Sequence, residues 1–211
     1  MHLSDMPIRI GIVEDDPLFL LALSRYLNSQ PDMNVTGTAA SRAEALQMIL
    51  LKPLDLILMD VVLSDQLDDG IQATIEILES LKVKIIMMSS RRDKDIILRA
   101  FAAGAIDFVP KTRYRQLPEI IRAALDVFNP HAILAEEYGE LRKKELLSRL
   151  SASEQEIFEL LHQGYTRSEI EKKLFKSAST IKNQINSILR KLEVSNSREA
   201  VRKVETRGVG R

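Results

Sequence analysis

IRIGIVEDD, residues 8–16, is an apolar run that ends abruptly in three acidic residues. Two later runs share this pattern: LILMD at residues 56–60 ends in an aspartate, and KIIMMSS at residues 84–90 ends in two serines. Runs that are apolar nearly throughout are typical of central strands in a parallel sheet, because both faces of such strands are buried. The three stretches therefore predict the centre of a parallel sheet with polar residues at the ends of its strands.

Segments with helical spacing alternate with the strands through residues 7–128. Five strand–helix repeats in this length predict an α/β fold, in which helices cover both faces of a five-stranded parallel sheet. The second strand is the most polar, which suits an edge of the sheet. The expected strands are 8–13, 34–38, 56–59, 84–88 and 107–109, and the expected helices are 17–29, 42–51, 71–80, 93–103 and 118–128.

The pattern changes after residue 128. Asn129-Pro130 breaks the last helix of the first half, because the residue before a proline disfavours helical geometry. No strand pattern follows, so the second half is predicted to be all-α. We expect a first domain at 7–128, a helical linker at 129–150 and a second domain at 151–207. The expected helices are 132–150, 153–163, 167–174, 180–191 and 197–204.

Composition limits the function classes of this 211-residue chain. It has no cysteine, which excludes disulfides, thiolate metal sites and thiol catalysis and fits a reducing compartment. Its three histidines, His2, His131 and His162, are isolated and are not expected to bind a metal. No apolar run is long enough to span a bilayer, and residues 1–20 lack a secretory signal pattern. We therefore expect a cytoplasmic globular protein without a membrane partner.

The net charge of zero conceals an asymmetry between the two halves. Residues 1–128 hold 18 acidic and 14 basic residues, whereas residues 164–211 hold 5 acidic and 12 basic residues. A basic region of this kind suits a polyanionic partner, although solvated helix faces would give the same count.

Chemically active side chains follow four of the five expected strands. Glu14 and Asp15 follow the first strand, Asp60 ends the third, Ser89 ends the fourth, and Lys111 follows the fifth. The carboxyl ends of parallel strands face one crevice, so these groups are expected to converge there. Clustered carboxylates favour Mg²⁺, and a carboxylate beside Mg²⁺ and an ammonium can accept a phosphoryl group. The simpler alternative is that the acids only cap the helices that follow.

These residues resemble the receiver domain of two-component response regulators. The resemblance covers residues 7–128 and implies a flavodoxin-like fold. It is carried by Val13-Glu14-Asp15-Asp16, Leu58-Met59-Asp60, Met88-Ser89-Ser90 and Phe108-Val109-Pro110-Lys111.

The receiver resemblance also implies a role for each of seven residues. Asp60 would be the phospho-acceptor, Lys111 the phosphate-binding ammonium, and Ser89 and Phe108 the switch residues. The Mg²⁺ ligands would be Glu14, Asp15, Asp60 and the backbone carbonyl of Val62. Asp16 is interpreted as a helix cap. A sensor histidine kinase would be the phosphodonor, and the chain is not expected to be a turnover enzyme.

The sequence departs from the receiver pattern at three places. Leu63-Ser64 stands where the family usually has Met-Pro, and the loop before Gly70 is about two residues longer, with extra acids at Asp65, Asp68 and Asp69. Pro110 precedes Lys111, whereas the family often has a proline after this lysine. These departures bear on metal affinity, phosphate lifetime and switch geometry.

The second domain contains two short helices joined by a few residues, at 167–174 and 180–191, which indicate a helix-turn-helix. The second helix has isoleucines on one face and amide and basic side chains on the other, and such side chains can bond bases and phosphates in a major groove. A helical packing module with a solvated face is the alternative.

The residues Ser177-x-x-Thr180-Ile181-Lys182-Asn183-Gln184-Ile185 resemble a LuxR-type DNA-binding domain, and the whole chain is similar to the NarL/FixJ class of response regulators. The resemblance implies binding of promoter DNA as a homodimer when phosphorylated, with 197–204 as the usual dimer surface. It also implies that six residues contact DNA: Thr180, Lys182, Asn183, Asn186, Arg190 and Lys191.

Two alternatives stay open. The apolar stripe of Leu134, Tyr138 and Leu141 suits either a dimer seam or packing against a domain. The chain as a whole could instead be a phosphorylation-independent partner-binding protein in which the receiver-like domain is structural.

Overall fold

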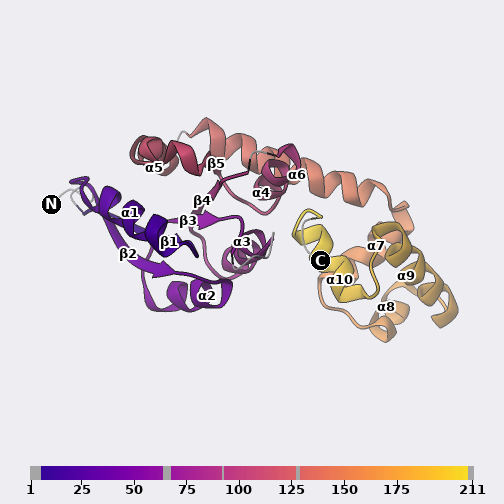
Figure 1. Cartoon of the computed structure of the whole chain (residues 1–211). Helices are drawn as coiled ribbons and strands as arrows, with labels where there is room; N and C mark the ends of the chain where they lie inside the picture. Colours follow the sequence, from indigo (N-terminus) through magenta and orange to yellow (C-terminus); the bar gives the residue numbers. More distant parts are fainter. Residues whose placement is uncertain (1–5, 64–67, 92, 127–128, 209–211) are drawn as a thin grey trace. The chain divides into compact units, whose positions relative to one another are not determined.

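The computed structural model describes residues 6–63, 68–91, 93–126 and 129–208. The chain divides into two compact units, Met1–Gly139 and Glu140–Arg211, and each is described by itself. The division falls inside one helix, α6 (Pro130–Ser148), which starts in the first unit and ends in the second (Figure 1). The domain limits expected from the sequence stay a prediction.

The first unit is built on a five-stranded sheet whose strands all pair in parallel. The strand order is β2-β1-β3-β4-β5, which is flavodoxin-like and confirms the α/β prediction. It also places the polar strand β2 at an edge and the three most apolar strands in the centre, as expected. The strands are β1 (Ile8–Val13), β2 (Met33–Ala39), β3 (Leu56–Asp60), β4 (Lys84–Ser89) and β5 (Asp107–Pro110).

Five α-helices connect or follow these strands on both faces of the sheet (Figure 1). The chain crosses from β1 to β2 in one direction and from β2 through β5 in the other, so right-handed crossovers put α1 opposite α2, α3 and α4. The helices are α1 (Pro17–Asn28), α2 (Arg42–Leu51), α3 (Asp69–Ser80), α4 (Lys94–Ala102) and α5 (Leu117–Leu125).

The core on the α1 face joins sheet and helices. Buried side chains of β1, β3 and β4 pack there against Leu23 and Leu27 of α1 and against Leu117 and Ile121 of α5. The two positions in each helix are four residues apart, so each helix presents one apolar face to the sheet. The core holds the strand ends, and the side chains they carry, in a fixed register.

One segment between β5 and α5 differs from the expectation. Lys111–Gln116 forms a 3-10 helix, η1, and α5 begins only at Leu117 with Pro118 in its first turn. Arg113 within η1 has φ −103° and ψ 17°, which interrupts helical geometry. The last expected helix was placed at 118–128, but α5 ends at Leu125 and residues 127–128 lie outside the described residues.

The second unit contains the end of α6 and four further helices, which agree with the expected ones to within two residues at each end. Leu146 and Leu150 pack with one face of each helix around the isoleucines Ile181, Ile185 and Ile188. The helices are α7 (Ala152–His162), α8 (Arg167–Leu174), α9 (Ala178–Leu192) and α10 (Ser197–Glu205).

Side-chain caps define where three of these helices begin. Ser151 and Glu154 form a capping box at α7, Ser177 caps α9 by accepting from the Thr180 N–H, and Asn196 caps α10. Each cap satisfies a backbone N–H that has no partner within the helix. Across the described ranges, no helix is both long and apolar enough to cross a membrane.

Candidate functional site

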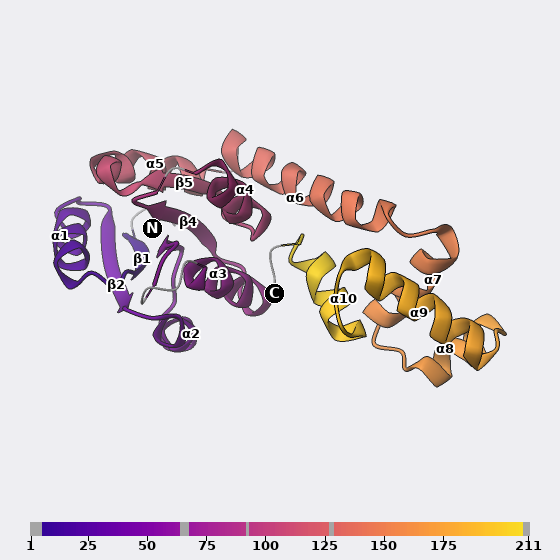
Figure 2. The same cartoon turned by 45° about the vertical axis from the view of Figure 1, so that its right-hand side comes forward.

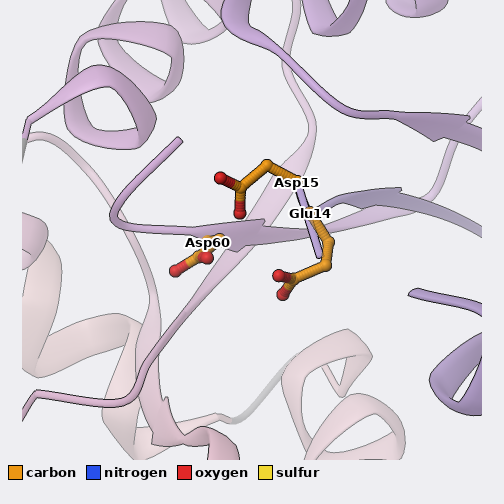
Figure 3. A group of neighbouring side chains, drawn as sticks. All are labelled: Glu14, Asp15 and Asp60. Atoms are coloured by element: carbon orange, nitrogen blue, oxygen red, sulfur yellow. The ribbon is translucent and has the colours of Figure 1, made fainter. Parts of the chain in front are cut away.

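The sheet register brings the ends of four strands together. Val13 of β1 lies beside Met59, Asp60 of β3 beside Met88, and Ser89 of β4 beside Pro110. The residues that follow or end these strands therefore meet at one end of the sheet, as the sequence predicted. Figure 3 shows the carboxylates of Glu14, Asp15 and Asp60 gathered at this end.

Glu14, Asp15 and Asp60 form a compact acidic group. Each offers a carboxylate oxygen, and these oxygens lie within 4.8 Å of one another. Glu14 is fully buried and Asp60 is 4% exposed, whereas Asp15 is exposed to solvent. Two buried carboxylates so close together repel each other and need a neighbouring positive charge.

Lys111 supplies one positive charge. Its Nζ lies 2.7 Å from Oδ2 of Asp60 and 2.7 Å from the Glu14 carboxylate, and its side chain is 16% exposed. The chain places Lys111 directly after β5, so this contact links the far edge of the sheet to its centre. The ammonium thus bridges the two buried acids.

Burial dominates the electrostatics of this group. It raises the pKa of the Asp60 carboxyl despite the hydrogen bond from Lys111, and it raises the pKa of the Glu14 carboxyl in the same way. Burial opposes the charge of Lys111 as well, but the hydrogen bonds to Asp60 and Glu14 outweigh it, and the pKa of this ammonium is raised. The site holds more negative charge than one lysine satisfies.

The donor set fits a hard divalent cation. Both oxygens of Glu14 lie close to Lys111, but only Oε1 has hydrogen-bond geometry, so Oε2 is buried without a hydrogen-bond partner. Three carboxylates with an unsatisfied buried oxygen and no histidine or cysteine are the ligands that Mg²⁺ prefers.

The remaining predicted site residues surround the acids. The Val62 N–H donates to Oδ1 of Asp60 at 3.3 Å, and the Ser89 hydroxyl is buried and accepts from the Arg91 N–H at 3.0 Å. Phe108 is half-buried on β5. The predicted roles of the Val62 carbonyl, Ser89 and Phe108 stay predictions.

Asp16 caps the helix that leaves the site. Its Oδ1 accepts from the N–H groups of Leu18 and Phe19, in the geometry of an N-cap. The interpretation of Asp16 as a cap is therefore confirmed, and among the described residues the acidic group consists of Glu14, Asp15 and Asp60.

Gly70 fits directly against the end of β3. A Cβ at this position would lie 1.7 Å from the backbone carbonyl oxygen of Asp60, and the Gly70 N–H donates to the Val61 carbonyl at 3.1 Å. No side chain fits in that space, so the first turn of α3 packs directly against the backbone of Asp60.

Two of the extra acids in the long loop are paired with arginines. Arg99 of α4 lies 2.8 Å from Asp68, and Arg42 of α2 lies 3.9 Å from Asp69 and also binds Glu76. Asp68 and Asp69 thus face arginines of neighbouring helices. Ser64 and Asp65, which the sequence also singled out, lie outside the described residues.

An aromatic partner of Lys111 escaped the sequence analysis. The Nζ of Lys111 lies 5.0 Å from the centre of the Phe19 ring, and Tyr114 packs edge-on against that ring. An ammonium over an aromatic face is attracted by the ring quadrupole. In the sequence, Phe19 is one of several apolar residues of α1. No local pattern indicates that it contacts Lys111, which follows β5.

The second unit presents a polar helix face. Ile181, Ile185, Ile188 and Leu192 of α9 are buried, and the opposite face is open to solvent. Five of the six residues predicted to contact DNA are exposed there: Thr180, Lys182, Asn183, Asn186 and Arg190.

The sixth predicted residue, Lys191, is engaged within the unit. Its Nζ donates to Oε2 of Glu154 on α7 at 2.6 Å, and Glu154 is only 6% exposed. Glu154 lies in the first turn of α7, and nothing in the sequence indicates this long-range partner. The DNA contact of Lys191 stays a prediction that this ion pair constrains.

A second interhelix link involves Ser153. Its hydroxyl accepts from Gln184 Nε2 at 2.7 Å and from Lys176 Nζ at 2.8 Å. The link ties the start of α7 to the middle of α9 and to the turn before it, which fixes α9 relative to the rest of the unit.

The fold and these two sites define a two-domain response regulator. The response regulator receiver domain family matches residues 10–122, and the luxR family of bacterial regulatory proteins matches residues 148–204. The chain belongs to the NarL/FixJ class of response regulators, with a receiver domain and a LuxR-type helix-turn-helix DNA-binding domain.

Individual relatives agree with this assignment. Response regulator protein VraR of Staphylococcus aureus is 32% identical over 202 residues, which cover 93% of this chain and 95% of VraR. Solved structures resemble this one as well. The NarL signal receiver domain of Mycobacterium tuberculosis has a TM-score of 0.51 at 26% identity, covering 56% of this chain and 97% of that one. RcsB of Salmonella typhimurium has a TM-score of 0.52 at 22% identity, covering 94% of this chain and 98% of that one, which shows the fold alone.

Proposed function

We propose that this response regulator receives a phosphoryl group on Asp60 from a sensor histidine kinase and then binds promoter DNA as a dimer. The observation that carries the first half is the bridge from Lys111 to Asp60 and Glu14 at 2.7 Å. It holds an ammonium beside a buried carboxylate, where charge develops during phosphoryl transfer.

In the proposed transfer, the carboxylate of Asp60 is the nucleophile. One carboxylate oxygen attacks the phosphorus of a phosphohistidine, the P–N bond breaks, and the leaving imidazole takes a proton from solvent. Lys111 then exchanges its bond to Asp60 for one to a phosphoryl oxygen, while the Val62 N–H remains near the same group. A Mg²⁺ ion held by Glu14, Asp15, Asp60 and the Val62 carbonyl would neutralise charge on the phosphoryl oxygens.

The proposed readout passes through Ser89 and Phe108. Phosphorylation replaces the carboxylate charge of Asp60 with a phosphoryl group that carries about −1.5 to −2, close to the Ser89 hydroxyl, which accepts from the Arg91 N–H. A hydroxyl can turn to donate to a phosphoryl oxygen, which would change the backbone at the end of β4 and the packing of Phe108 on β5.

The experiment that tests the acceptor uses Asp60→Asn. With a labelled small-molecule phosphodonor and Mg²⁺, the wild-type chain should become labelled and Asp60→Asn should not, although it keeps its fold. Asp68→Asn is the matched control, because Asp68 is an acid of the same region that pairs with Arg99, and it should label normally. Undiminished labelling of Asp60→Asn would place the acceptor elsewhere.

The DNA half of the proposal rests on the exposed polar face of α9. RcsB, which shares the fold, has been solved bound to promoter DNA in the presence of a phosphomimetic. We expect α9 to enter the major groove and α10 to pair with a second copy. Two half-sites should then lie about 10 bp apart, centre to centre, with two-fold related sequences. A footprint over one asymmetric half-site would contradict the dimer.

A further inference from the structure

Phe175 has the most exposed large apolar side chain among the described residues, with 96% of its surface open to solvent. It ends α8 in the left-handed region, at φ 52° and ψ 37°. This conformation is unfavourable for a bulky side chain, and glycine or asparagine usually occupies it. Neither burial nor backbone preference within the unit accounts for a phenylalanine here.

The position of Phe175 is fixed relative to the start of α9. The N–H groups of Phe175 and Lys176 both donate to the Glu171 carbonyl, which ties the turn to α8. Ser177, two residues further on, caps α9. Figure 2 shows α8 and α9 joined by this short turn. Phe175 therefore lies two residues before the N-cap of the helix that carries Thr180 and Lys182.

Basic residues outnumber acidic ones in the sequence around Phe175, although Glu171 lies one turn before it and Glu156 pairs with Lys176. Residues 172–192 contain six basic residues and no acidic residue. Lys172 and Lys173, three and two residues before Phe175, are exposed on α8. The only other large apolar side chain exposed in the described part of this unit is Leu141, which is 64% exposed and lies on α6. A single ring among lysines lacks the apolar area of a protein interface, but it suits a polyanion with apolar spots between its charges.

We propose that Phe175 packs against an apolar part of duplex DNA, a thymine methyl group or a deoxyribose, next to the groove that α9 enters. Thymine methyls are the apolar features of the major groove, and phenylalanine is among the side chains that contact them. This inference rests on the proposed DNA binding by α9. It adds a contact from the turn, outside the six residues that the sequence predicted.

The test compares two substitutions in the full-length chain. The probe is a duplex selected by the wild-type protein from a random pool. Phe175→Asn suits the left-handed backbone, so its unfolding midpoint should stay or rise, while its affinity for the duplex falls by about 10-fold or more. The slope of log affinity against log salt should not change, because no phosphate contact is lost. Phe175→Tyr keeps the ring and should bind as the wild type does.

Replacement of each thymine by deoxyuracil then separates the two apolar sources. If removal of one methyl abolishes the difference between wild type and Phe175→Asn, the ring contacts that thymine; if the difference persists at every position, the ring contacts deoxyribose. Equal affinity of wild type and Phe175→Asn would overturn this inference alone. A change of about one unit in the salt slope of Phe175→Asn would also overturn the inference, because it would indicate the loss of a phosphate contact. If the wild type selects no duplex, the DNA-binding proposal falls, and this inference falls with it.

Discussion

Glu154 and Lys191 form an ion pair that joins the start of α7 to the end of α9. The Nζ of Lys191 lies 2.6 Å from Oε2 of Glu154, and the same oxygen accepts from the Ser151 N–H at 2.7 Å in the capping box. Burial opposes the charge on this carboxylate, but the hydrogen bonds from Lys191 and the neighbouring serines outweigh it and lower the pKa of Glu154 to about 2. The carboxylate therefore stabilises the folded unit in its charged form.

Glu154→Gln should destabilise the second unit by about 1–3 kcal/mol near neutral pH, because it leaves Lys191 without its buried partner. A lowered pKa contributes stability that is complete above the unfolded value of about 4.5 and is lost as pH falls toward about 2. The difference between variant and wild type should thus shrink in acid. Urea unfolding of the full chain at several pH values measures it.

Glu156→Gln is the matched control for this substitution. Glu156 lies on the same helix, is 54% exposed and pairs with Lys176 only at 3.6 Å. Its removal should change stability by less than about 0.5 kcal/mol at every pH. A difference for Glu154→Gln that stays constant with pH would contradict a role for its charge.

Arg190→Ala should weaken binding to all DNA sequences similarly and flatten the salt slope by about one unit, as expected for a phosphate contact. Arg190 is exposed on α9, whereas Lys191 is paired with Glu154. Lys191→Ala should therefore also lower the unfolding midpoint, which Arg190→Ala should leave unchanged. Salt titrations of DNA binding, together with thermal unfolding, separate the effect of Arg190→Ala from that of Lys191→Ala. A salt slope unaffected by Arg190→Ala would remove this residue from the phosphate contacts.

Asn183→Ala should reduce discrimination between sequences by about 1–3 kcal/mol if its amide makes a bidentate base contact. Asn183 is exposed on α9, so its loss should not affect folding. Affinities for the selected duplex and for a shuffled duplex measure the effect. A similar loss of affinity for both duplexes would show that Asn183 contacts the DNA backbone instead of a base.

Mg²⁺ should stabilise the first unit through the acidic group. A ligand at about 100 times its dissociation constant stabilises by about 2.7 kcal/mol. Asp15→Asn should remove most of this Mg²⁺ effect without unfolding the unit, because Asp15 is exposed. Thermal unfolding across a Mg²⁺ titration gives the result.

Asp16→Asn is the control for the Mg²⁺ effect. Asparagine is as good an N-cap as aspartate, so the start of α1 should survive the change and the response to Mg²⁺ should remain. An equal Mg²⁺ response in Asp15→Asn and Asp16→Asn would exclude Asp15 as a ligand.

Local sequence patterns determined how much of the fold could be predicted. The apolar runs and helical spacings predicted every strand, and they placed the helices to within a few residues at each end, since period and capping act locally. The segment at Lys111–Gln116 was missed, because a 3-10 turn before Leu117-Pro118 leaves no apolar period of its own.

The candidate site was predictable only where chemistry follows strand ends. Glu14, Asp60 and Lys111 each come at such a position, so their convergence followed from the parallel sheet. The contact between Phe19 and Lys111 could not be predicted in this way, because it depends on how α1 packs against the segment after β5. The pair of Glu154 with Lys191 has the same origin in tertiary packing. Opposite charges are abundant in both halves, and spacing alone does not select partners.

The close approach of Gly70 to Asp60 has a mechanical consequence. A glycine with no room for a Cβ leaves no compressible side chain between the end of β3 and the first turn of α3. The Asp60 carbonyl and the first turn of α3 are therefore in direct backbone contact, and a displacement of this carbonyl toward α3 would press on that turn. A movement at the end of β3 would thus reach α3 through backbone atoms, with no side chain of Gly70 to take it up.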